Sequence, residues 1–282
     1  MRFNKYHGTG NDFIILDGME EGPFLSAREI EALCRRHTGI GADGVIFACT
    51  SRSGADAAMR IFNADGSEAE MCGNGIRCLA KYLYERLGMR KEGLFIETLA
   101  GVKALSLSVE EGSVREVEVD MGLPEFAAMG LPTPDDPSRP GEVNIRLANG
   151  EDLWAFCLSM GNPHCVLFVP TAADAPVSRL GLLLESHELF PNRTNVEFVQ
   201  VENGHRMIVR VWERGVGETQ ACGTGACAAA VAAIHGSRCK SPIEVYLPGG
   251  VLNIRIDEGG HVLMAGPAAE VFSGELSSAW TV

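Results

Sequence analysis

The sequence predicts an α+β protein of two similar halves, each an antiparallel sheet wrapped around a central helix, with the candidate site in the cleft between them. The first observation is a repeated loop: residues 71–75 (MCGNG) and 221–225 (ACGTG) each carry one cysteine followed by Gly-x-Gly. The second is that a helical pattern follows each loop. The third is a strand-like run before each loop, at 60–66 and 207–215. Repeats of this size are typical of two copies of one module.

The two helices are predicted by apolar residues at i, i+3, i+4 and i+7. After the first loop these positions are Ile76, Leu79, Ala80 and Leu83, and after the second they are Ala226, Ala229, Ala230 and Ala233. Coincidence is the alternative to a true repeat, because Cys-Gly pairs are not rare in glycine-rich loops.

The elements of the N-terminal half follow in order. Residues 11–17 alternate as a strand, and Ser26 with Glu29 forms a capping box for a helix that we expect to run to about His37. The glycine-spaced loop 39–44 lacks the Gly-Lys-Ser/Thr of a P-loop and precedes a strand at 45–48, so it is interpreted as a close-packing turn. Further strands are predicted at 95–98, 102–109 and 114–119.

A segment rich in Gly, Pro and Asp, residues 122–142, is the predicted domain crossing. Strands follow at 143–147, 153–159, 164–169, 196–201, 207–213, 244–247, 251–256 and 261–265. We therefore expect one half to span 1–121, joined by 268–282, and the other to span 122–267.

Composition excludes several classes of protein. The net charge of −13 argues against nucleic acid, which needs a basic face. No apolar run is long enough to span a membrane, and the N-terminus shows no hydrophobic secretion core, so we expect a cytoplasmic protein.

Nine cysteines in a chain with no signal peptide predict reduced thiols. Their spacing does not fit a zinc knuckle and neither glycine loop holds a histidine, so no metal is expected. Seven are expected to be buried structural thiols: Cys34, Cys49, Cys78, Cys157, Cys165, Cys227 and Cys239.

Cys72 and Cys222 differ from the other seven because each stands immediately before a predicted helix. The positive end of a helix dipole favours a thiolate, so we expect both pKa values to be lowered. Two such thiols suggest a matched pair of proton donors and acceptors.

Polar side chains lie near the predicted strand ends. Any one of four asparagines can be interpreted as a turn former: Asn11, Asn63, Asn162 and Asn195. The segment 160–164 (MGNPH) is different, because its sharp turn directs Asn162 and His164 the same way. His164 is either a hydrogen-bonded strand-end histidine or a base that tunes a nearby thiol. Glu213 and Arg214 are either a surface ion pair or the groups that meet a substrate ammonium and carboxylate.

Together these motifs resemble diaminopimelate epimerases. The most specific match is the segment 63–77 (NADGSEAEMCGNGIR). Further matching segments are 7–13, 39–43, 161–164, 193–195 and 213–225. They occur in the family's order and extend the resemblance over almost the whole chain.

The resemblance implies a cofactor-independent epimerase that interconverts LL- and meso-diaminopimelate on the route to lysine. It implies that Cys72 and Cys222 are the acid/base pair, in an active site at the cleft between the halves. By resemblance, the distal end of the substrate would be held by Asn11, Asn63, Asn162, Asn195 and Arg214. The backbone at Gly73, Asn74, Gly223 and Thr224 would bind the reacting carboxylate, Glu213 would meet the ammonium, and His164 with Glu213 would tune the thiols.

Two positions depart from the family pattern. Gly44 replaces a glutamine that contacts substrate in some members, and Phe272 replaces a tyrosine at a dimer contact, which puts the possible homodimer in doubt.

Two alternatives stay open: a proline or hydroxyproline racemase-like enzyme of the same fold, and a non-catalytic thiol redox or binding protein. None of the five lysines stands beside the motifs, so pyridoxal phosphate is not expected. The only expected partners are the small-molecule substrate and a possible second copy of the chain.

Overall fold

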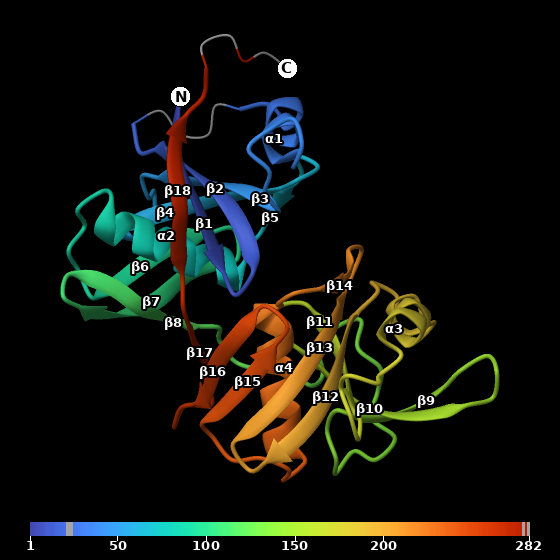
Figure 1. Cartoon of the computed structure of the whole chain (residues 1–282). Coiled ribbons are helices and arrows are strands. Elements are labelled where there is room, and N and C mark those ends of the chain that lie inside the picture. Colours follow the sequence, from blue (N-terminus) through green and yellow to red (C-terminus); the bar gives the residue numbers. More distant parts are fainter. Residues whose placement is uncertain (21–24, 278–279, 281–282) are drawn as a thin grey trace. The chain divides into compact units, whose positions relative to one another are not determined.

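The computed structural model describes residues 1–20, 25–277 and 280. By internal contacts the chain forms two compact units, Met1–Asp120 with Ala265–Val282, and Met121–Met264. Strands predominate over helices in both, so the predicted α+β class is confirmed (Figure 1).

The helices among the described residues of the first unit are α1 (Ala27–Cys34) and α2 (Gly73–Glu85). Its strands are β1 (Arg2–Gly8), β2 (Asn11–Gly18), β3 (Gly44–Cys49), β4 (Ala57–Asn63), β5 (Glu68–Ala69), β6 (Gly93–Thr98), β7 (Gly101–Glu110), β8 (Ser113–Asp120) and β18 (Ala269–Glu275). Residues 278–279 and 281–282 of the predicted joining segment lie outside the described residues.

The second unit contains helices α3 (Val177–Glu185) and α4 (Gly223–His235). Its strands are β9 (Glu142–Arg146), β10 (Asp152–Ser159), β11 (Pro163–Phe168), β12 (Asn195–Asn203), β13 (Arg206–Glu213), β14 (Gly217–Thr219), β15 (Ile243–Leu247) and β16 (Gly250–Ile256). Strand β17 (Val262–Gly266) crosses the boundary, with residues 262–264 in the second unit and 265–266 in the first.

The two units repeat one topology. In the first, β1, β2, β3 and β4 are neighbours, and β4 pairs with both β5 and β6. In the second, β10, β11, β12 and β13 are neighbours, and β13 pairs with both β14 and β15. This correspondence extends to the helices and excludes a coincidence of two cysteine loops.

The prediction of purely antiparallel sheets is wrong, because each sheet is mixed. β2–β3 and β4–β6 are parallel in the first unit, and β11–β12 and β13–β15 are parallel in the second. A helix lies between the two strands of every one of these pairs in the chain. Parallel neighbours require such a crossover, whereas a tight turn joins antiparallel strands.

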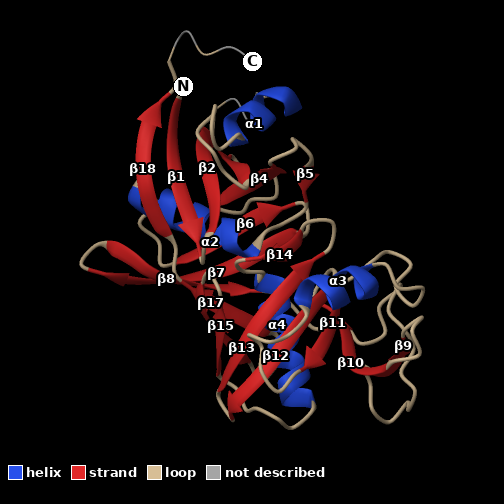
Figure 2. Cartoon of the chain, turned by 45° about the vertical axis from the view of Figure 1, so that its right-hand side comes forward, coloured by secondary structure: helices blue, strands red, loops and turns tan. Residues whose placement is uncertain are grey.

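Helices α2 and α4 are the centres of their units. All residues of α2 except the last, Glu85, are buried, and α2 contacts β1 to β4, β7, β8 and β18. Helix α4 is likewise buried along most of its length and contacts β10 to β13, β15 and β16 (Figure 2). Each sheet therefore wraps around its helix, as predicted.

Helix α1 has the predicted capping box, in which Ser26 and Glu29 bond each other's backbone N–H. Ile30, Leu33 and Cys34 form its buried face, also as predicted. It ends at Cys34 rather than near His37, because the N–H groups of Gly41 and Ala42 bond the carbonyls of Leu33 and Cys34. These bonds satisfy the helix end and turn the chain away.

Five elements were not predicted: the short strands β5 and β14, and β1, α3 and β18. Polar Asn4, Lys5 and His7 interrupt the strand pattern of β1. Helix α3 has Gly181 at its middle, which lowers helix propensity. A Cβ at Gly181 would lie 2.4 Å from the Trp212 ring, so the glycine lets α3 pack closely on β13.

All seven cysteines expected to be structural are buried. Burial raises the pKa of Cys34 to about 11 and that of Cys78 to about 12, which keeps both thiols protonated and unreactive.

Candidate active site

Cys72 is the N-cap residue of α2. Its backbone is extended (φ −140°, ψ 119°), and its sulfur accepts a hydrogen bond from the Gly75 N–H, with Gly75 N 3.4 Å from Sγ. A helix N-terminus leaves N–H groups without helical partners, and here the thiol takes one of them. The extended backbone and the short side chain of Cys72 thus hold its Sγ at the start of α2.

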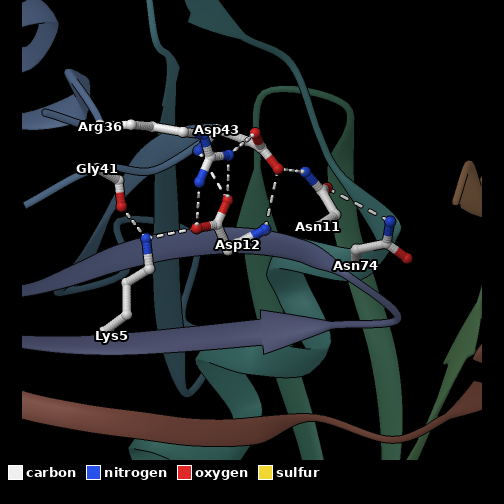
Figure 3. A network of polar contacts seen from close by, with 7 residues as sticks. All are labelled: Lys5, Asn11, Asp12, Arg36, Gly41, Asp43 and Asn74. Atoms are coloured by element: carbon white, nitrogen blue, oxygen red, sulfur yellow. Dashed lines mark hydrogen bonds and ion pairs between the residues drawn. The ribbon is translucent and has the colours of Figure 1, made fainter. Parts of the chain in front are cut away.

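Asn11, from the start of β2, lies beside this thiol. Its Oδ1 is 3.7 Å from Cys72 Sγ and 3.4 Å from Asn74 Nδ2. Its Nδ2 donates to Asp43 Oδ2 at 2.8 Å (Figure 3). This bond turns the amide oxygen toward Cys72. The structure thus joins Asn11, Cys72 and Asn74, three of the predicted site residues.

Behind Asn11 lies a network of charges that was not predicted from the sequence. Asp12 accepts from both Nη atoms of Arg36 at 3.1 and 2.9 Å and pairs with buried Lys5 at 2.6 Å (Figure 3). Arg36 Nη2 also donates to Asp43 Oδ1 at 2.6 Å. Although burial raises the pKa of Asp12, the hydrogen bonds from Arg36 and Lys5 outweigh it and hold that pKa well below its usual range. The anion is therefore fixed next to Asn11.

The loop that follows Cys72 is held by Arg77, which is fully buried. Its Nη1 donates to the Gly73 carbonyl at 3.1 Å, and its Nη2 donates to Asn74 Oδ1 at 3.0 Å and to Thr9 Oγ1 at 3.2 Å. A Cβ at Gly8 would approach the Asn74 carbonyl to 3.0 Å, so the glycine keeps the passage of β1 past the loop uncrowded. These contacts fix the backbone of Gly73 and Asn74.

Asn63 is not joined to this group. Its side chain is exposed and donates to Ser67 Oγ at 3.0 Å, and within the described residues no hydrogen bond connects it to Asn11. Gly44 pairs with Asn63 across β3 and β4, and a Cβ there would lie 2.5 Å from the Phe62 carbonyl. A side chain at position 44 would therefore require the two strands to separate.

Cys222 is the N-cap residue of α4 and repeats the geometry of Cys72 (φ −120°, ψ 117°). Its sulfur accepts from the Gly225 N–H at 3.3 Å and lies 3.5 Å from Thr224 Oγ1. Burial and the neighbouring Glu213 carboxylate raise the pKa of Cys222 well above that of a free thiol, although Thr224 and Gly225 oppose the shift. The predicted lowering by the helix start is therefore wrong for Cys222, because desolvation outweighs it.

Glu213, the last residue of β13, is itself largely buried. Burial raises its pKa, while hydrogen bonds from Thr219 Oγ1 and Cys222 act in the opposite direction. The pair Glu213 and Cys222 thus shares a desolvated environment in which a negative charge is costly for both groups.

His164 lies at the start of β11 and is fully buried. Its Nδ1 is 2.7 Å from Glu197 Oε1 on the parallel neighbour β12, and its Nε2 is 2.9 Å from Asn162 Oδ1. Asn162 Nδ2 donates to Thr224 Oγ1 at 3.4 Å. His164 therefore connects to Cys222 through Asn162 and Thr224. Glu197 was missed because it stands in an apolar strand pattern without a motif.

Asn195 and Arg214 are joined through the backbone. Asn195 Oδ1 accepts from the Arg214 N–H at 2.9 Å, and its Nδ2 donates to the Pro163 carbonyl at 3.0 Å. The Arg214 side chain reaches the Asn192 carbonyl at 3.0 Å and is not paired with Glu213 by any described ion pair. The surface ion pair considered for Glu213 and Arg214 is thus not formed.

Glu185 of α3 anchors the loop that carries Arg214. Its oxygens accept from the Gly215 N–H at 2.9 Å and from Trp212 Nε1 at 2.7 Å. Neither Glu185 nor its helix was predicted from the sequence.

Among the described residues, no group of three or more His, Cys, Asp or Glu side chains is arranged to hold a metal ion. None of the described helices has the length and apolar character that crossing a membrane requires.

The chain matches the family described as diaminopimelate epimerase over residues 3–127 and 156–271. It is 50% identical to the diaminopimelate epimerase of Pelotomaculum thermopropionicum, with 98% of each chain covered. It is 48% identical to the diaminopimelate epimerase of a Synechocystis species, again with 98% of each chain covered.

Solved structures of lower identity have the same fold. A probable proline racemase from Agrobacterium radiobacter matches with a TM-score of 0.70 at 15% identity, covering 98% of this chain and 93% of that one. A hydroxyproline epimerase from Agrobacterium vitis matches with a TM-score of 0.70 at 16% identity, covering 98% of this chain and 90% of that one.

Proposed function

The chain belongs to the diaminopimelate epimerase family, which makes it an isomerase, and we propose that it interconverts LL- and meso-diaminopimelate by proton transfer between two thiols and one α-carbon. The observation that carries the mechanism is the duplicated N-cap: Cys72 and Cys222 hold their sulfur atoms in the same way at the starts of α2 and α4.

Inversion at an α-carbon requires removal of a proton from one face and delivery to the other. A single base would tend to return the proton to the face it came from. We infer that Cys72 and Cys222 act from opposite faces, one as thiolate and one as thiol, and exchange roles with the direction of reaction. No cofactor is needed for this proton transfer.

Negative charge moves into the substrate carboxylate as the proton leaves. The N–H groups of Gly73 and Asn74, and of Gly223 and Thr224, lie in the first turns of α2 and α4. First-turn N–H groups lack helical acceptors and stabilise a growing anion, and losing one such donor costs roughly 3 kcal/mol. We assign the reacting carboxylate to these groups.

The remaining substrate groups are the reacting ammonium and the distal end, and we assign them to residues of matching charge and hydrogen-bonding capacity. Glu213 would take the reacting ammonium, and Asn11, Asn63, Asn162, Asn195 and Arg214 would hold the distal end. The link between Asn195 and the Arg214 backbone supports a joint role for those two residues. The charge that burial penalises on Glu213 would be neutralised by an ammonium, which supports the role of Glu213.

We further propose the two-half organisation 1–121 with 268–282 and 122–267, a cytoplasmic location, a place in lysine biosynthesis and a homodimer. The compact units support the first of these. Phe272 is 46% exposed on β18 and stacks edge-on against Phe3, so an apolar contact surface is retained without a tyrosine hydroxyl.

The test is an assay of the purified protein with LL-diaminopimelate, L-proline and trans-4-hydroxy-L-proline. We expect turnover of diaminopimelate alone. Cys72→Ala and Cys222→Ala should each reduce it by at least about 10²-fold, because one face loses its proton carrier. Cys157→Ala, which alters a buried thiol, is the control. Turnover of proline instead would favour the racemase alternative, and near wild-type activity in either cysteine variant would exclude the two-thiol mechanism.

A further inference from the structure

Glu197 is a carboxylate whose charge acts on Cys222, and the proposed reaction does not use it. It is fully buried, its Oε1 contacts His164 Nδ1, and its Oε2 is buried without a hydrogen-bond partner. An unpartnered buried oxygen on a full negative charge is costly unless the charge is compensated. The question is therefore where the compensating proton lies.

The contacts of His164 answer this question. Its Nε2 faces Asn162 Oδ1, and an amide oxygen only accepts hydrogen bonds, so Nε2 must carry a hydrogen. Its Nδ1 faces Glu197 Oε1 at 2.7 Å, and a hydrogen must lie between these two atoms as well. The pair then holds two protons, either as a carboxylic acid with neutral imidazole or as a carboxylate with imidazolium. Both forms have no net charge.

We propose that Glu197 is a positioning residue for Cys222, which acts by keeping the second proton on the Glu197–His164 pair and so fixing the hydrogen on His164 Nε2. The protonation of the pair does not depend on the proposed function. Only the expected effect on diaminopimelate turnover rests on that function.

The hydrogen on Nε2 sets the direction of every later contact. It holds Asn162 Oδ1, so that Asn162 Nδ2 donates to Thr224 Oγ1. Thr224 Oγ1 already accepts that bond, so its own hydrogen can be donated to Cys222 Sγ, 3.5 Å away. Gly225 N–H donates to the same sulfur. Cys222 therefore has two donors directed at it, which is the arrangement that a thiolate requires.

Loss of the second proton would reverse this order. A neutral imidazole that donated from Nδ1 to a Glu197 carboxylate would present a lone pair at Nε2, and Asn162 would turn its NH₂ toward it. Thr224 would then donate to Asn162 instead of to Cys222. The pair therefore decides whether the sulfur receives the Thr224 hydrogen.

The charges around Glu197 favour retention of the proton. Burial raises its pKa, and the neighbouring His164 only partly opposes the shift. The titratable groups that sense its charge are His164, Glu213, Cys222 and Cys165. Apart from His164, these groups are acids, so a second negative charge at Glu197 would be unfavourable.

The experiment is ¹⁵N NMR of the histidine side chains in the whole, substrate-free protein between pH 6.5 and 8.5, with His164→Gln used to assign the signals. Long-range ¹H–¹⁵N spectra show which ring nitrogen carries hydrogen. We expect His164 Nε2 to be protonated over the whole range. A wild-type His164 with an unprotonated Nε2 would overturn the proposal.

Two variants test the role of Glu197 itself. Glu197→Gln can donate from its amide to Nδ1, so it should keep the hydrogen on Nε2 and keep kcat within about threefold. Glu197→Leu leaves Nδ1 without a partner, so it should lose the fixed Nε2 hydrogen and lower kcat by about tenfold or more, with KM changed by less than about twofold. Glu202→Leu removes an exposed carboxylate from the same strand and should change neither measurement.

Wild-type spectra and wild-type kcat in Glu197→Leu would also overturn the proposal. If Glu197→Leu does not fold, the wild type and Glu197→Gln still decide it. Complete absence of diaminopimelate turnover in the wild type would remove the proposed function, whereas the spectra would continue to decide the protonation of the pair.

Discussion

Asn11 Oδ1 lies 3.7 Å from Cys72 Sγ because the other end of the Asn11 amide is bound to Asp43 at 2.8 Å. An asparagine that is free to rotate could present either NH₂ or oxygen to the thiol. Asp43 accepts hydrogen bonds only, so it selects the orientation in which oxygen faces the sulfur. The charge network of Asp12 and Arg36 thus acts on the Cys72 thiol through Asp43 and the Asn11 amide.

Asp43→Ala should therefore reduce kcat by about tenfold while the fold is kept, because Asn11 loses its fixed orientation. Asp43→Asn retains an oxygen that can accept the Asn11 hydrogen and should keep more activity. Steady-state kinetics on both variants measure this. Equal activity in Asp43→Ala and the wild type would show that the orientation of Asn11 does not matter.

Asp12→Asn should destabilise the protein by about 2 kcal/mol at pH 7, because the buried Lys5 and the exposed Arg36 both lose their anion. The pKa of Asp12 is lower in the folded state than its unfolded value near 3.8. The stability from this carboxylate is thus complete above that value and is lost as the pH falls toward the folded pKa.

Denaturant unfolding at pH 7, 4 and 2.5 checks this prediction, with Asp17→Asn, an exposed residue of the same strand, as the control. The difference in free energy of unfolding between Asp12→Asn and the wild type should become smaller as the pH falls. A difference that stays constant over this range would contradict the assigned charge network.

Glu213→Gln should lower the pKa of Cys222, because a neighbouring carboxylate disfavours the thiolate and its removal relieves part of the shift. The pH midpoint for alkylation of Cys222 in the substrate-free protein should move to lower pH. Peptide mass spectrometry after treatment with iodoacetamide measures it. Glu218→Gln, at an ion pair with Arg210, should leave the midpoint unchanged.

Gly225→Ala should damage the Cys222 site. The new Cβ would lie 2.8 Å from Glu197 Oε1 and 3.3 Å from Cys222 Sγ, and overpacking of this kind costs about 1–3 kcal/mol. We expect a lower melting temperature and reduced kcat. Gly204→Ala, where nothing lies within 4 Å of the added Cβ, should behave as the wild type.

Much of the fold could be predicted because its signals are local. The capping box of Ser26, the periodic faces after Cys72 and Cys222, and most strands have patterns that depend on near neighbours. Parallel pairing could not be predicted in this way, because it depends on which strands a crossover helix brings together. Helix α3 was missed because its central Gly181 serves a contact with Trp212, which is distant in sequence.

The same distinction applies to the site. Cys72, Cys222, Asn11 and His164 stand in motifs with unusual residue combinations. Asp12, Asp43 and Glu197 act through contacts from other strands and loops, and the sequence around Glu197 is that of an ordinary buried strand. The raised pKa of Cys222 was also out of reach, because desolvation depends on the packing around the sulfur.

The central claim is that one thiol removes the α-proton and a different thiol delivers its replacement. The most direct test is the reaction of LL-diaminopimelate in D₂O, stopped at low conversion and analysed by mass spectrometry. We predict that newly formed meso-diaminopimelate carries one deuterium while the remaining LL-isomer carries none. Product that retains the original hydrogen, or early deuterium in the unreacted LL-isomer, would contradict the two-thiol account.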